Sequence, residues 1–338
     1  MRAAVLTAPG SLSIEDRPRP ACPPGGVLLK VAACGLCASD LKMWRWGHKE
    51  LKLPRVLGHE VAGVVEESDS VQMPVGEMVQ VAPGMPCGSC SACLRGQHNR
   101  CPQVEVLGFS LDGGLAEFMA VPAEGLAGGA VIALPFGLNM TAASLAEPLA
   151  CILNAWQQAK LVSGEIVAII GAGPVGRLAA WSAKSLGAGK VVLMDKEPAR
   201  LRELGFSRIN LQKDDALEAA RQALEGGADV ILPACSDPRA LTWGLELLNP
   251  GGRLVLFSGL KEPAYLDLNK AHYRELNLIG AYGCTAAQNK RALDLLASGL
   301  VPADLIISHR LPLSSVLKGL DLMERRAALK VVIHPQEE

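Results

Sequence analysis

Four cysteines stand close together in the chain with the spacing of a metal site. They are Cys87, Cys90, Cys93 and Cys101, in the pattern C-x2-C-x2-C-x7-C. A structural zinc ion takes four thiolates at tetrahedral corners, and a short C-x2-C turn supplies two of them from one bend. The remaining cysteines are scattered singly, so no set of spacings indicates a disulfide framework. The cluster predicts a closed zinc site that holds together a lobe at about residues 84–103 and has no open position for catalysis.

A second set of possible metal ligands is dispersed along the chain. Its members are Cys37, Ser39 and Asp40 in one segment, His59 and Glu60 in a Gly-His-Glu triplet, and Glu147 in a Glu-Pro pair. A catalytic zinc needs three protein ligands and a fourth position open to water or substrate. Cys37 and His59 are natural ligands, and Glu147 or Glu60 can supply a carboxylate. Taken singly, each residue also fits an ordinary structural role, so spacing alone leaves this second metal site open.

The segment Gly171-Ala-Gly-Pro-Val-Gly176 has the pattern GxGxxG. It follows an apolar run that predicts a strand and begins a stretch that predicts a helix, which is the context that the nucleotide-binding fingerprint requires. Gly171 makes the tight turn, Gly173 lets the backbone approach a pyrophosphate, and Gly176 packs the helix against the strand. Pro174 and Val175 begin the helix, whose N-terminus offers N–H groups to phosphates. The alternative is a glycine turn in an unrelated α/β protein.

An acidic residue, Asp195, ends the next predicted strand. A carboxylate at this place accepts hydrogen bonds from the ribose hydroxyls of NAD, and it repels the 2′-phosphate of NADP. Lys196 and Arg200 follow it closely, and basic residues just past the strand can accommodate NADP. The segment predicts NAD as the preferred dinucleotide and leaves NADP as the alternative.

These motifs lie in two parts of the chain that differ in pattern. Residues 1–147 are rich in Gly and Pro, with β-like runs at 26–32, 60–66 and 117–122. Frequent Pro and Gly between short runs predict an antiparallel, barrel-like β domain. This part carries the cysteine lobe and the second set of ligands.

From residue 152 onward, strand-like runs alternate with helical stretches. We expect strands at 165–170, 190–194, 228–232 and 253–257, and the first helix at 175–186. This alternation predicts βαβ units and a parallel sheet. The tail repeats neither pattern, and we expect there a helix at 289–298, a loop, a helix at 314–325 and a last strand at 329–333.

Length and composition exclude several classes of protein. A chain of 338 residues is long enough for two domains. A net charge of −1 gives no basis for binding nucleic acid or a membrane surface, and no run approaches the ~18 apolar residues of a membrane span. The N-terminus has no signal-peptide pattern. Because clustered thiolates suit a reducing compartment, we expect a cytoplasmic protein.

Together, the cysteine lobe, the GxGxxG segment, Gly-His-Glu and Cys-x-Ser-Asp resemble the zinc-dependent medium-chain dehydrogenases, the alcohol and polyol dehydrogenase superfamily. The resemblance covers essentially the whole chain, with the motifs in the family's order. It implies an α/β protein with a GroES-like β-rich catalytic domain at 1–147, a Rossmann domain with a doubly wound parallel sheet at 148–284, and a C-terminal return to the catalytic domain at 285–338. It also implies a homotetramer. An exposed edge strand near 253–257 or 276–281 would suit pairing in a symmetric homodimer.

The resemblance also implies a set of ligands for a catalytic zinc. In this family the zinc takes the Cys of the first motif, here Cys37, the His of Gly-His-Glu, here His59, and a third ligand. In the sorbitol dehydrogenase-like branch the third ligand is the Glu of a Glu-Pro pair, here Glu147. The alcohol dehydrogenases proper use a second Cys, and we expect Cys151, four residues further on, to be a core residue. Glu60 is expected near the metal as an alternative or water-mediated ligand.

The implied chemistry is the oxidation of an alcohol. Zinc lowers the pKa of a bound hydroxyl, and a hydride passes from its carbon to the nicotinamide. Ser39 would take the hydroxyl proton and pass it outward, and Asp40 would hold the geometry of the metal ligands.

One position departs from the family pattern. Many relatives carry a His five residues after the zinc cysteine, where this chain has Lys42. Lys42 can relay a proton, bind an anionic group of a sugar phosphate or sugar acid, or belong to a solvated face. The basic stretch that follows it contains Arg45, His48, Lys49, Lys52 and Arg55.

The leading hypothesis is a zinc- and NAD-dependent dehydrogenase, with two zinc ions per chain, acting on a secondary alcohol of a polyol, sugar or cyclitol. Oxidation of an amino alcohol, as in threonine dehydrogenases, or of a sugar phosphate or sugar acid is the alternative within the enzymes. A non-catalytic NAD(H)-binding regulator would need neither Cys37 nor Ser39. A zinc-ribbon nucleic-acid binder is disfavoured because the cysteine lobe lacks basic surroundings.

Overall fold

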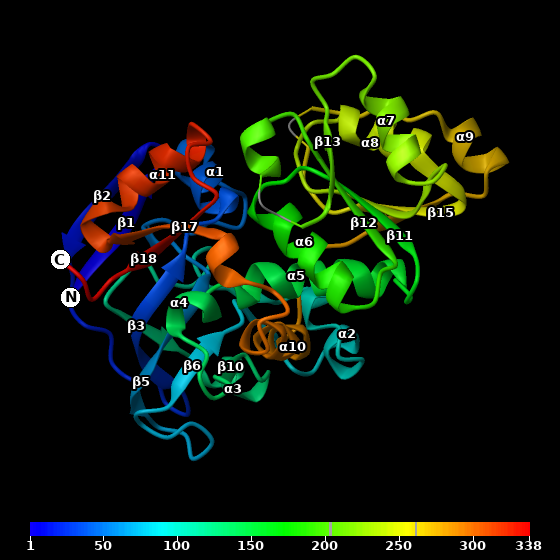
Figure 1. The fold of residues 1–338 in the computed structure, drawn as a ribbon. Helices are drawn as coiled ribbons and strands as arrows, with labels where there is room; N and C mark the ends of the chain where they lie inside the picture. The colour runs from blue at the N-terminus through cyan, green and yellow to red at the C-terminus, as the bar shows by residue number, and fades with distance from the viewer. Residues whose placement is uncertain (203–204, 261) are drawn as a thin grey trace. The chain divides into compact units, whose positions relative to one another are not determined.

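A computed structural model of the protein describes residues 1–202, 205–260 and 262–338, and the described chain divides into two units (Figure 1). Unit 1 consists of Met1–Ala150, Cys284–Gly299 and Ala303–Glu338, and unit 2 of Cys151–Gly283 and Leu300–Pro302. The N-terminal and C-terminal parts of the chain therefore belong to one unit. The domain limits expected from the sequence, after residues 147 and 284, lie next to these divisions.

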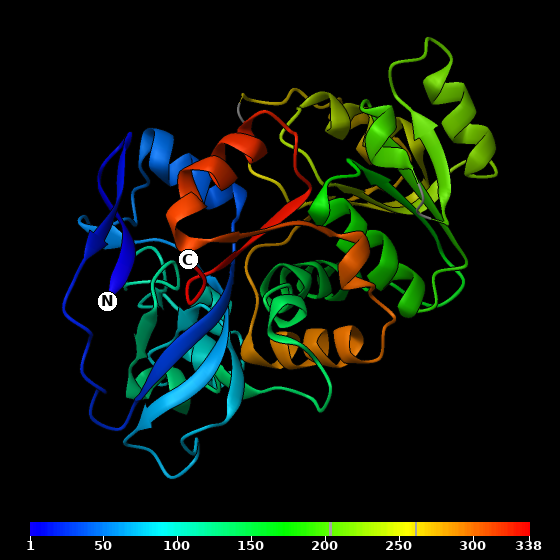
Figure 2. The same cartoon turned by 60° about the vertical axis from the view of Figure 1, so that its left-hand side comes forward.

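Unit 1 is built on a seven-stranded sheet, counted over the described residues, with the order β10-β6-β5-β3-β18-β17 and with β9 paired to β3. The long strands β3 and β5 run side by side in it (Figure 2). All pairs are antiparallel except β17 with β18, which confirms a β-rich first domain. The strands are β3 (Val27–Gly35), β5 (Glu60–Ser68), β6 (Met78–Val81), β9 (Phe118–Val121), β10 (Val131–Ala133), β17 (Ile307–Pro312) and β18 (Lys330–His334).

Shorter elements complete unit 1. A second sheet has the order β2-β1-β4, with β1 at Arg2–Ala8, β2 at Ser11–Asp16 and β4 at Arg55–Val56, and β7 (Gly84–Met85) pairs with β8 (Glu105–Val106). Helix α1 (Ala38–Trp46) follows β3 directly, and the cysteine lobe contains α2 (Ser91–Leu94). The other helices of this unit are α3 (Ala123–Ala127), α4 (Met140–Ala143), α10 (Ala286–Ala297) and α11 (Val316–Glu324).

Strand β17 and helix α1 are among the elements of unit 1 that the sequence did not predict. Strand β17 replaces the loop expected between the last two helices, and only one of its six residues is buried. Helix α1 was not expected at all, and only Asp40 and Met43 of its nine residues are buried. Because hydrophobic periodicity is the main signal for secondary structure in a sequence, elements with so few buried positions leave little trace.

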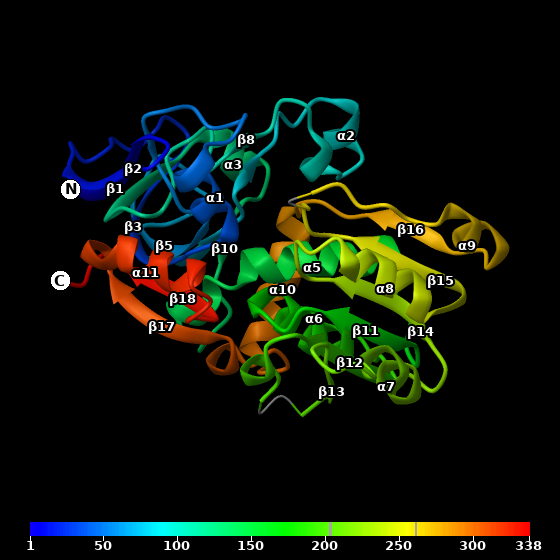
Figure 3. The same ribbon diagram turned by 90° about the horizontal axis from the view of Figure 1, so that it is seen from above.

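Unit 2 contains a parallel sheet with the order β13-β12-β11-β14-β15-β16 (Figure 3). The chain runs from β11 outward to β13 and then returns to β14 on the other side of β11, so the strand order reverses beside β11. Such a reversal is the mark of a doubly wound sheet and the usual place of its ligand. The strands are β11 (Ile166–Ile170), β12 (Lys190–Asp195), β13 (Ser207–Asn210), β14 (Ala228–Pro233), β15 (Leu248–Leu256) and β16 (Asn277–Gly280).

Strand β16 forms one edge of this sheet, because β15 lies between it and β14. The edge expected at 276–281 coincides with β16. The alternative at 253–257 is wrong, since that segment lies in β15, which is paired on both sides.

The helices of the protein are short. Helix α5 (Ala146–Ala159) begins in unit 1 and continues into unit 2, and it has 14 residues. Unit 2 also contains α6 (Pro174–Ser185), α7 (Ala216–Ala223), α8 (Arg239–Leu247) and α9 (Leu268–Tyr273). Within the described ranges, none of the helices has the length and apolar character needed to cross a membrane.

Candidate active site and metal centres

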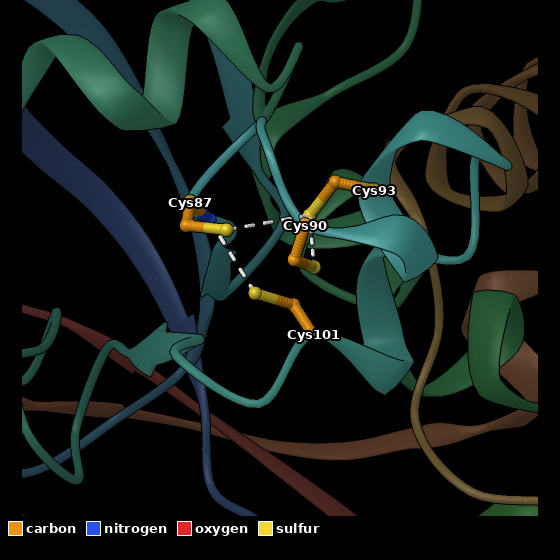
Figure 4. A group of neighbouring side chains, drawn as sticks. All are labelled: Cys87, Cys90, Cys93 and Cys101. Carbon is orange, nitrogen blue, oxygen red and sulfur yellow. Dashed lines mark hydrogen bonds between the residues drawn. The ribbon is translucent and has the colours of Figure 1, made fainter.

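The four cysteines of the lobe lie together, as their spacing predicts. Their sulfur atoms are all within 4.8 Å of one another, and Figure 4 shows them gathered around one point. The Sγ atoms of Cys90 and Cys93 are 3.5 Å apart, and those of Cys87 and Cys93 are 3.9 Å apart. Two thiolates bound to a tetrahedral zinc at ~2.3 Å lie ~3.8 Å apart, whereas a disulfide requires ~2.05 Å. The donor set therefore fits zinc, and all four thiols are free.

Backbone groups favour negative charge on two of these thiols. Hydrogen bonds from the backbone at Ser89 and Cys90 lower the pKa of the Cys87 thiol to about 6. The backbone at Cys93 likewise lowers the pKa of Cys90. Desolvation raises the pKa of Cys93 to about 12, so that thiol ionises only beside a positive charge. A bound cation would supply that charge, since metal binding releases thiol protons.

The second set of ligands gathers around His59. Cys37, His59 and Glu60 each place a ligand atom within 4.8 Å of the other two. Cys37 follows the end of β3, and His59 and Glu60 stand at the start of β5. Because β3 pairs with β5, with Gly35 opposite Glu60, the two motifs meet at one end of this strand pair.

The carboxylate of Asp40 contacts both Cys37 and His59. This carboxylate is fully buried and accepts hydrogen bonds from the N–H of Cys37 at 2.8 Å and from the N–H of Gly58 at 3.2 Å. The same carboxylate lies 3.6 Å from Nδ1 of His59. The other ring nitrogen, Nε2, lies 3.3 Å from Oγ of Ser39. A carboxylate behind one ring nitrogen and a ligand position at the other is the arrangement common to metal-binding histidines.

The charges around His59 favour a cation. Burial lowers the pKa of His59, but the negative charge of Asp40 and the contacts with Asp40 and Cys37 outweigh burial and hold that pKa well above its ordinary value. Surroundings that stabilise a proton on a buried ring also stabilise a metal ion bound to it. With a thiolate and an imidazole as donors, the site suits zinc.

Gly58, the glycine of Gly-His-Glu, has a backbone conformation that requires glycine. Gly58 has a φ of +94°, and a Cβ there would lie 2.6 Å from Sγ of Cys34 and 2.8 Å from Cγ of Leu115. Side chains other than glycine rarely adopt this φ, and these neighbours leave no room for one.

Glu60 has a partner that the sequence did not reveal. Lys330, at the start of β18, is buried and forms an ion pair with the buried carboxylate of Glu60. Its Nζ also donates a hydrogen bond to the carbonyl of Leu36 at 2.9 Å. Burial lowers the pKa of Lys330, but the charge of Glu60 outweighs burial and raises that pKa above its ordinary value. The only sequence signal was a lysine at the start of an apolar last strand.

Glu147 lies outside the group formed by Cys37, His59 and Glu60. It is buried in the first turn of α5, and its carboxylate lies within 4.8 Å of the thiol of Cys284. It is close enough to Lys330 to raise the pKa of that lysine. Cys151 is half-buried one turn further along α5. Glu60, and not Glu147, is thus the glutamate grouped with Cys37 and His59, and Glu147 as third zinc ligand stays a prediction.

Most cations of the basic stretch after Lys42 form ion pairs with acidic residues. These ion pairs are Arg45–Glu324, Lys49–Glu50, Lys52–Glu105 and Arg55–Asp112. Lys42 is exposed on α1, and no ion pair joins it to another described residue. A solvated face therefore accounts for most of the stretch, and only Lys42 keeps the alternatives of proton relay and anion binding.

Phe109 could not be singled out from the sequence. Its ring lies 5.6 Å from the ring of His59 and 5.4 Å from that of His48. This half-buried ring provides an apolar wall beside the ligand group, which would help to exclude water there.

The GxGxxG segment joins β11 to α6, as predicted. A Cβ on Gly176 would lie 1.7 Å from the carbonyl oxygen of Gly171, so only glycine lets the helix begin this close to the turn. Gly173 precedes the first residue of α6, and Pro174 occupies the first turn together with Val175. Because the first N–H groups of a helix have no partners within it, this end of α6 fits the phosphates of a dinucleotide.

The residues expected to choose the cofactor lie after β12. Asp195 is buried, and its carboxylate accepts a hydrogen bond from the N–H of Ala172 at 2.6 Å. Nη1 of Arg200 lies 3.4 Å from the place of a Cβ on Gly173. Lys196 is half-buried and, after Arg239, helps to lower the pKa of Asp237. Asp195, which would favour NAD, and Arg200, which can accommodate NADP, thus both lie beside the glycine turn.

The comparison with known proteins covers both units. Residues 23–130 match the family model of the alcohol dehydrogenase GroES-like domain, and residues 174–298 match that of the zinc-binding dehydrogenases. A sorbitol dehydrogenase from Bacillus subtilis (strain 168) is 33% identical over 350 residues, covering 99% of this chain and 97% of the relative. An L-threonine 3-dehydrogenase from Bacillus velezensis is 32% identical over 335 residues, covering 96% and 95%.

The same likeness extends to solved structures. A zinc-binding dehydrogenase from Sinorhizobium meliloti 1021, bound to NADP, has a TM-score of 0.91 and 28% identity, with 99% of each chain covered. Motifs, fold and similarity along the whole length agree, and the chain belongs to the zinc-type medium-chain dehydrogenases, the alcohol and polyol dehydrogenase superfamily.

Proposed function

We propose that the protein is a zinc- and NAD-dependent dehydrogenase that oxidises a secondary alcohol of a polyol, sugar or cyclitol. The observation that carries this proposal is the group formed by Cys37, His59 and Ser39 in front of the buried Asp40. A regulator that only bound a dinucleotide would need no hydroxyl 3.3 Å from Nε2 of His59.

Each chain would hold two zinc ions. Cys37 and His59 would hold the catalytic ion, with Glu147 as the third ligand and Glu60 as the alternative. The four lobe cysteines would hold the second ion, which has a structural role because no ligand position is left for a substrate. Free thiols in the lobe also support a reducing compartment such as the cytoplasm.

The residues of unit 1 would bind the alcohol and receive its proton. When bound, zinc supplies Lewis acidity to the alcohol oxygen, and the nicotinamide accepts a hydride. Ser39 is placed beside Nε2 of His59, and its hydroxyl can take the proton that the alcohol gives up while passing its own proton outward. Asp40 keeps the imidazole ring and the backbone of Cys37 in their orientation.

NAD is the cofactor that we favour, because the buried carboxylate of Asp195 would repel a 2′-phosphate. NADP is the alternative, supported by Arg200 beside the glycine turn and by the relative that was solved with NADP.

The relatives and Lys42 bear on the class of the substrate. Similar relatives include both a sorbitol and a threonine dehydrogenase, so an amino alcohol is the second candidate. The exposed Lys42 is the observation that favours a sugar phosphate or sugar acid.

A substrate panel tests the proposal. Polyols, cyclitols, sugar phosphates, sugar acids and L-threonine would each be supplied with NAD or NADP, and reduced cofactor would be followed by absorbance at 340 nm. We expect the fastest turnover with NAD and a neutral polyol or cyclitol, in protein whose elemental analysis gives two zinc ions per chain. Binding of NADH without turnover of any alcohol would indicate the regulator instead.

A further inference from the structure

Ala172, between the first two glycines of the turn, is held by charged side chains at both of its backbone polar groups. Its N–H donates to Oδ2 of Asp195 at 2.6 Å, and its carbonyl accepts from Nε of Arg177 at 3.4 Å. The same two side chains also hold the segment after β12. Oδ1 of Asp195 accepts from the N–H of Glu197 at 2.8 Å, and Nη2 of Arg177 donates to the carbonyl of Arg200 at 2.9 Å. Two side chains of opposite charge thus tie the glycine turn to residues 197–200.

Arg177 is the less expected member of this pair. It follows Gly176 in the first turn of α6, and it is buried. Arginine is rarely buried unless its guanidinium is paired or hydrogen-bonded, because the charge loses its hydration. An apolar side chain would pack at this position without that loss. A packing role therefore does not account for a guanidinium here.

The segment that Arg177 holds carries a side chain directed at the cofactor region. Nη1 of Arg200 lies 3.4 Å from the place of a Cβ on Gly173, the residue whose missing side chain lets a pyrophosphate approach. A guanidinium can form two parallel hydrogen bonds with a phosphate group. Because Arg177 fixes the carbonyl of Arg200, it fixes the point from which that side chain extends.

We propose that Arg177 is a positioning residue for the dinucleotide. It holds the backbone of Arg200 so that the guanidinium of Arg200 contacts the pyrophosphate at the start of α6. The inference rests on the proposed dinucleotide-dependent function. Since NAD and NADP share the pyrophosphate, Arg177 supports affinity for both and leaves the choice between them to other residues.

Binding of NADH and NADPH to the zinc-loaded protein tests this inference, by calorimetry and by fluorescence titration. The variants are Arg177→Met, Arg200→Met and the double variant, because methionine keeps much of the length of the side chain without its donors. Each single variant should weaken the binding of both dinucleotides by about tenfold, the effect of one charge-assisted hydrogen bond. The double variant should bind about as weakly as Arg200→Met alone, because coupled residues do not show additive effects.

Arg208→Met is the matched control. Nη1 of Arg208 donates to the carbonyl of Leu201 at 3.0 Å, so this variant removes a similar bond from the residue next to Arg200. It should leave both affinities unchanged. Thermal unfolding of every variant separates a loss of fold from a loss of positioning, and Arg177→Lys, which keeps the charge and one donor, should bind with intermediate affinity.

Three results would overturn the inference. They are wild-type affinity in a folded Arg177→Met variant, additive losses in the double variant, and a loss confined to NADPH, which would place Arg200 at the 2′-phosphate. If Arg177→Met does not fold, the same cycle with Arg177→Lys decides between these results and the expected one. Failure of the wild-type protein to bind either dinucleotide would instead contradict the proposed function.

Discussion

The residues around His59 differ in how far their roles follow from local sequence. Asp40 contacts Cys37 within a single helical turn, so the motif that contains both could predict that Asp40 supports the ligands. The pairing of Glu60 with Lys330 depends instead on β18 lying beside β3. A lysine at the far end of the chain carries no local sign of such a contact. The motifs therefore named the donors of the site but not the charge that balances Glu60.

Mutation can distinguish the roles of the carboxylates of Glu147 and Glu60. Glu147→Ala should leave the protein folded, remove one zinc ion per chain and abolish activity, because the third ligand of the catalytic zinc is lost. Glu60→Gln should retain the zinc but lower the free energy of unfolding by ~3–5 kcal/mol, since the buried Lys330 would lose the carboxylate with which it forms its ion pair. Elemental analysis and thermal unfolding of both variants check this. Zinc lost from Glu60→Gln and kept in Glu147→Ala would make Glu60 the ligand.

Ser39 and Lys42 should differ in their effects on the pH profile. Ser39→Ala should lower turnover by ~10² or more, the scale of general-base catalysis, with little change in NAD affinity. Oxidation should become faster as pH rises, with an apparent pKa that belongs to the coupled groups.

If Lys42 relays the proton, Lys42→Ala should change this pH profile for every substrate. If Lys42 binds an anion, the variant should raise KM only for charged substrates. Steady-state kinetics from acid to alkaline pH distinguish these results, and no change would assign Lys42 to the solvated face.

At the scale of helices and strands, prediction succeeded where burial leaves a pattern. Strands β11, β12 and β14 consist mostly of buried residues, and their apolar runs could be recognised in the sequence. Strand β17 and helix α1 bury too few residues for this. Their places are set by partners elsewhere, β18 in the case of β17, and a sequence alone does not show such pairing.

The cysteine lobe should depend on its metal, because its elements are too short to be stable alone. Helix α2 has four residues, far fewer than an isolated helix needs. Cys93→Ser should therefore remove one zinc ion per chain and lower the melting temperature. Elemental analysis and calorimetry measure both effects, and Cys22→Ser, outside the lobe, is the control. An unchanged melting temperature after loss of that zinc would show that the lobe folds without it.

The turn after β12 should set the preference for NAD. Asp195→Ala should narrow the difference between the two cofactors in kcat/KM, because it removes the charge that repels a 2′-phosphate. Part of any loss with NAD will come from the turn itself, since Asp195 also holds the N–H groups of Ala172 and Glu197. Asp195→Asn, which keeps an acceptor without the charge, separates these effects. A wild-type protein that used NADP better than NAD would show that Arg200 or Lys196 governs the pocket.

For the molecule as a whole, the order of the motifs already indicated that the C-terminal segment returns to the first domain. The reason is visible in β18, which pairs with β3 in the sheet of unit 1, while residues 151–283 form the sheet of unit 2. The sequence could not decide between 253–257 and 276–281 as the edge of that sheet, because both runs are similarly apolar. The edge depends on the strand order, in which β16 lies outside β15.

The exposed edge of unit 2 should pair with a second copy of the chain. Among the residues that the structure describes, no strand lies beside β16 on its outer side, and such edges are usually covered or paired. All three tyrosines of the chain lie in the segments around it, with Tyr265, Tyr273 and Tyr282 exposed by 91%, 81% and 82%, and exposed aromatic residues are enriched at interfaces between subunits. We therefore expect a homodimer, or the tetramer that the family resemblance implies.

Light scattering tests this assembly. Leu278→Lys places a charge on β16 and should shift the protein toward monomer, whereas Phe136→Lys, at an exposed position of unit 1, should not. A wild-type protein that remained at 35.5 kDa over the accessible concentrations would contradict the prediction. In that case another part of the same chain, or its side chains alone, must keep the edge of β16 from pairing.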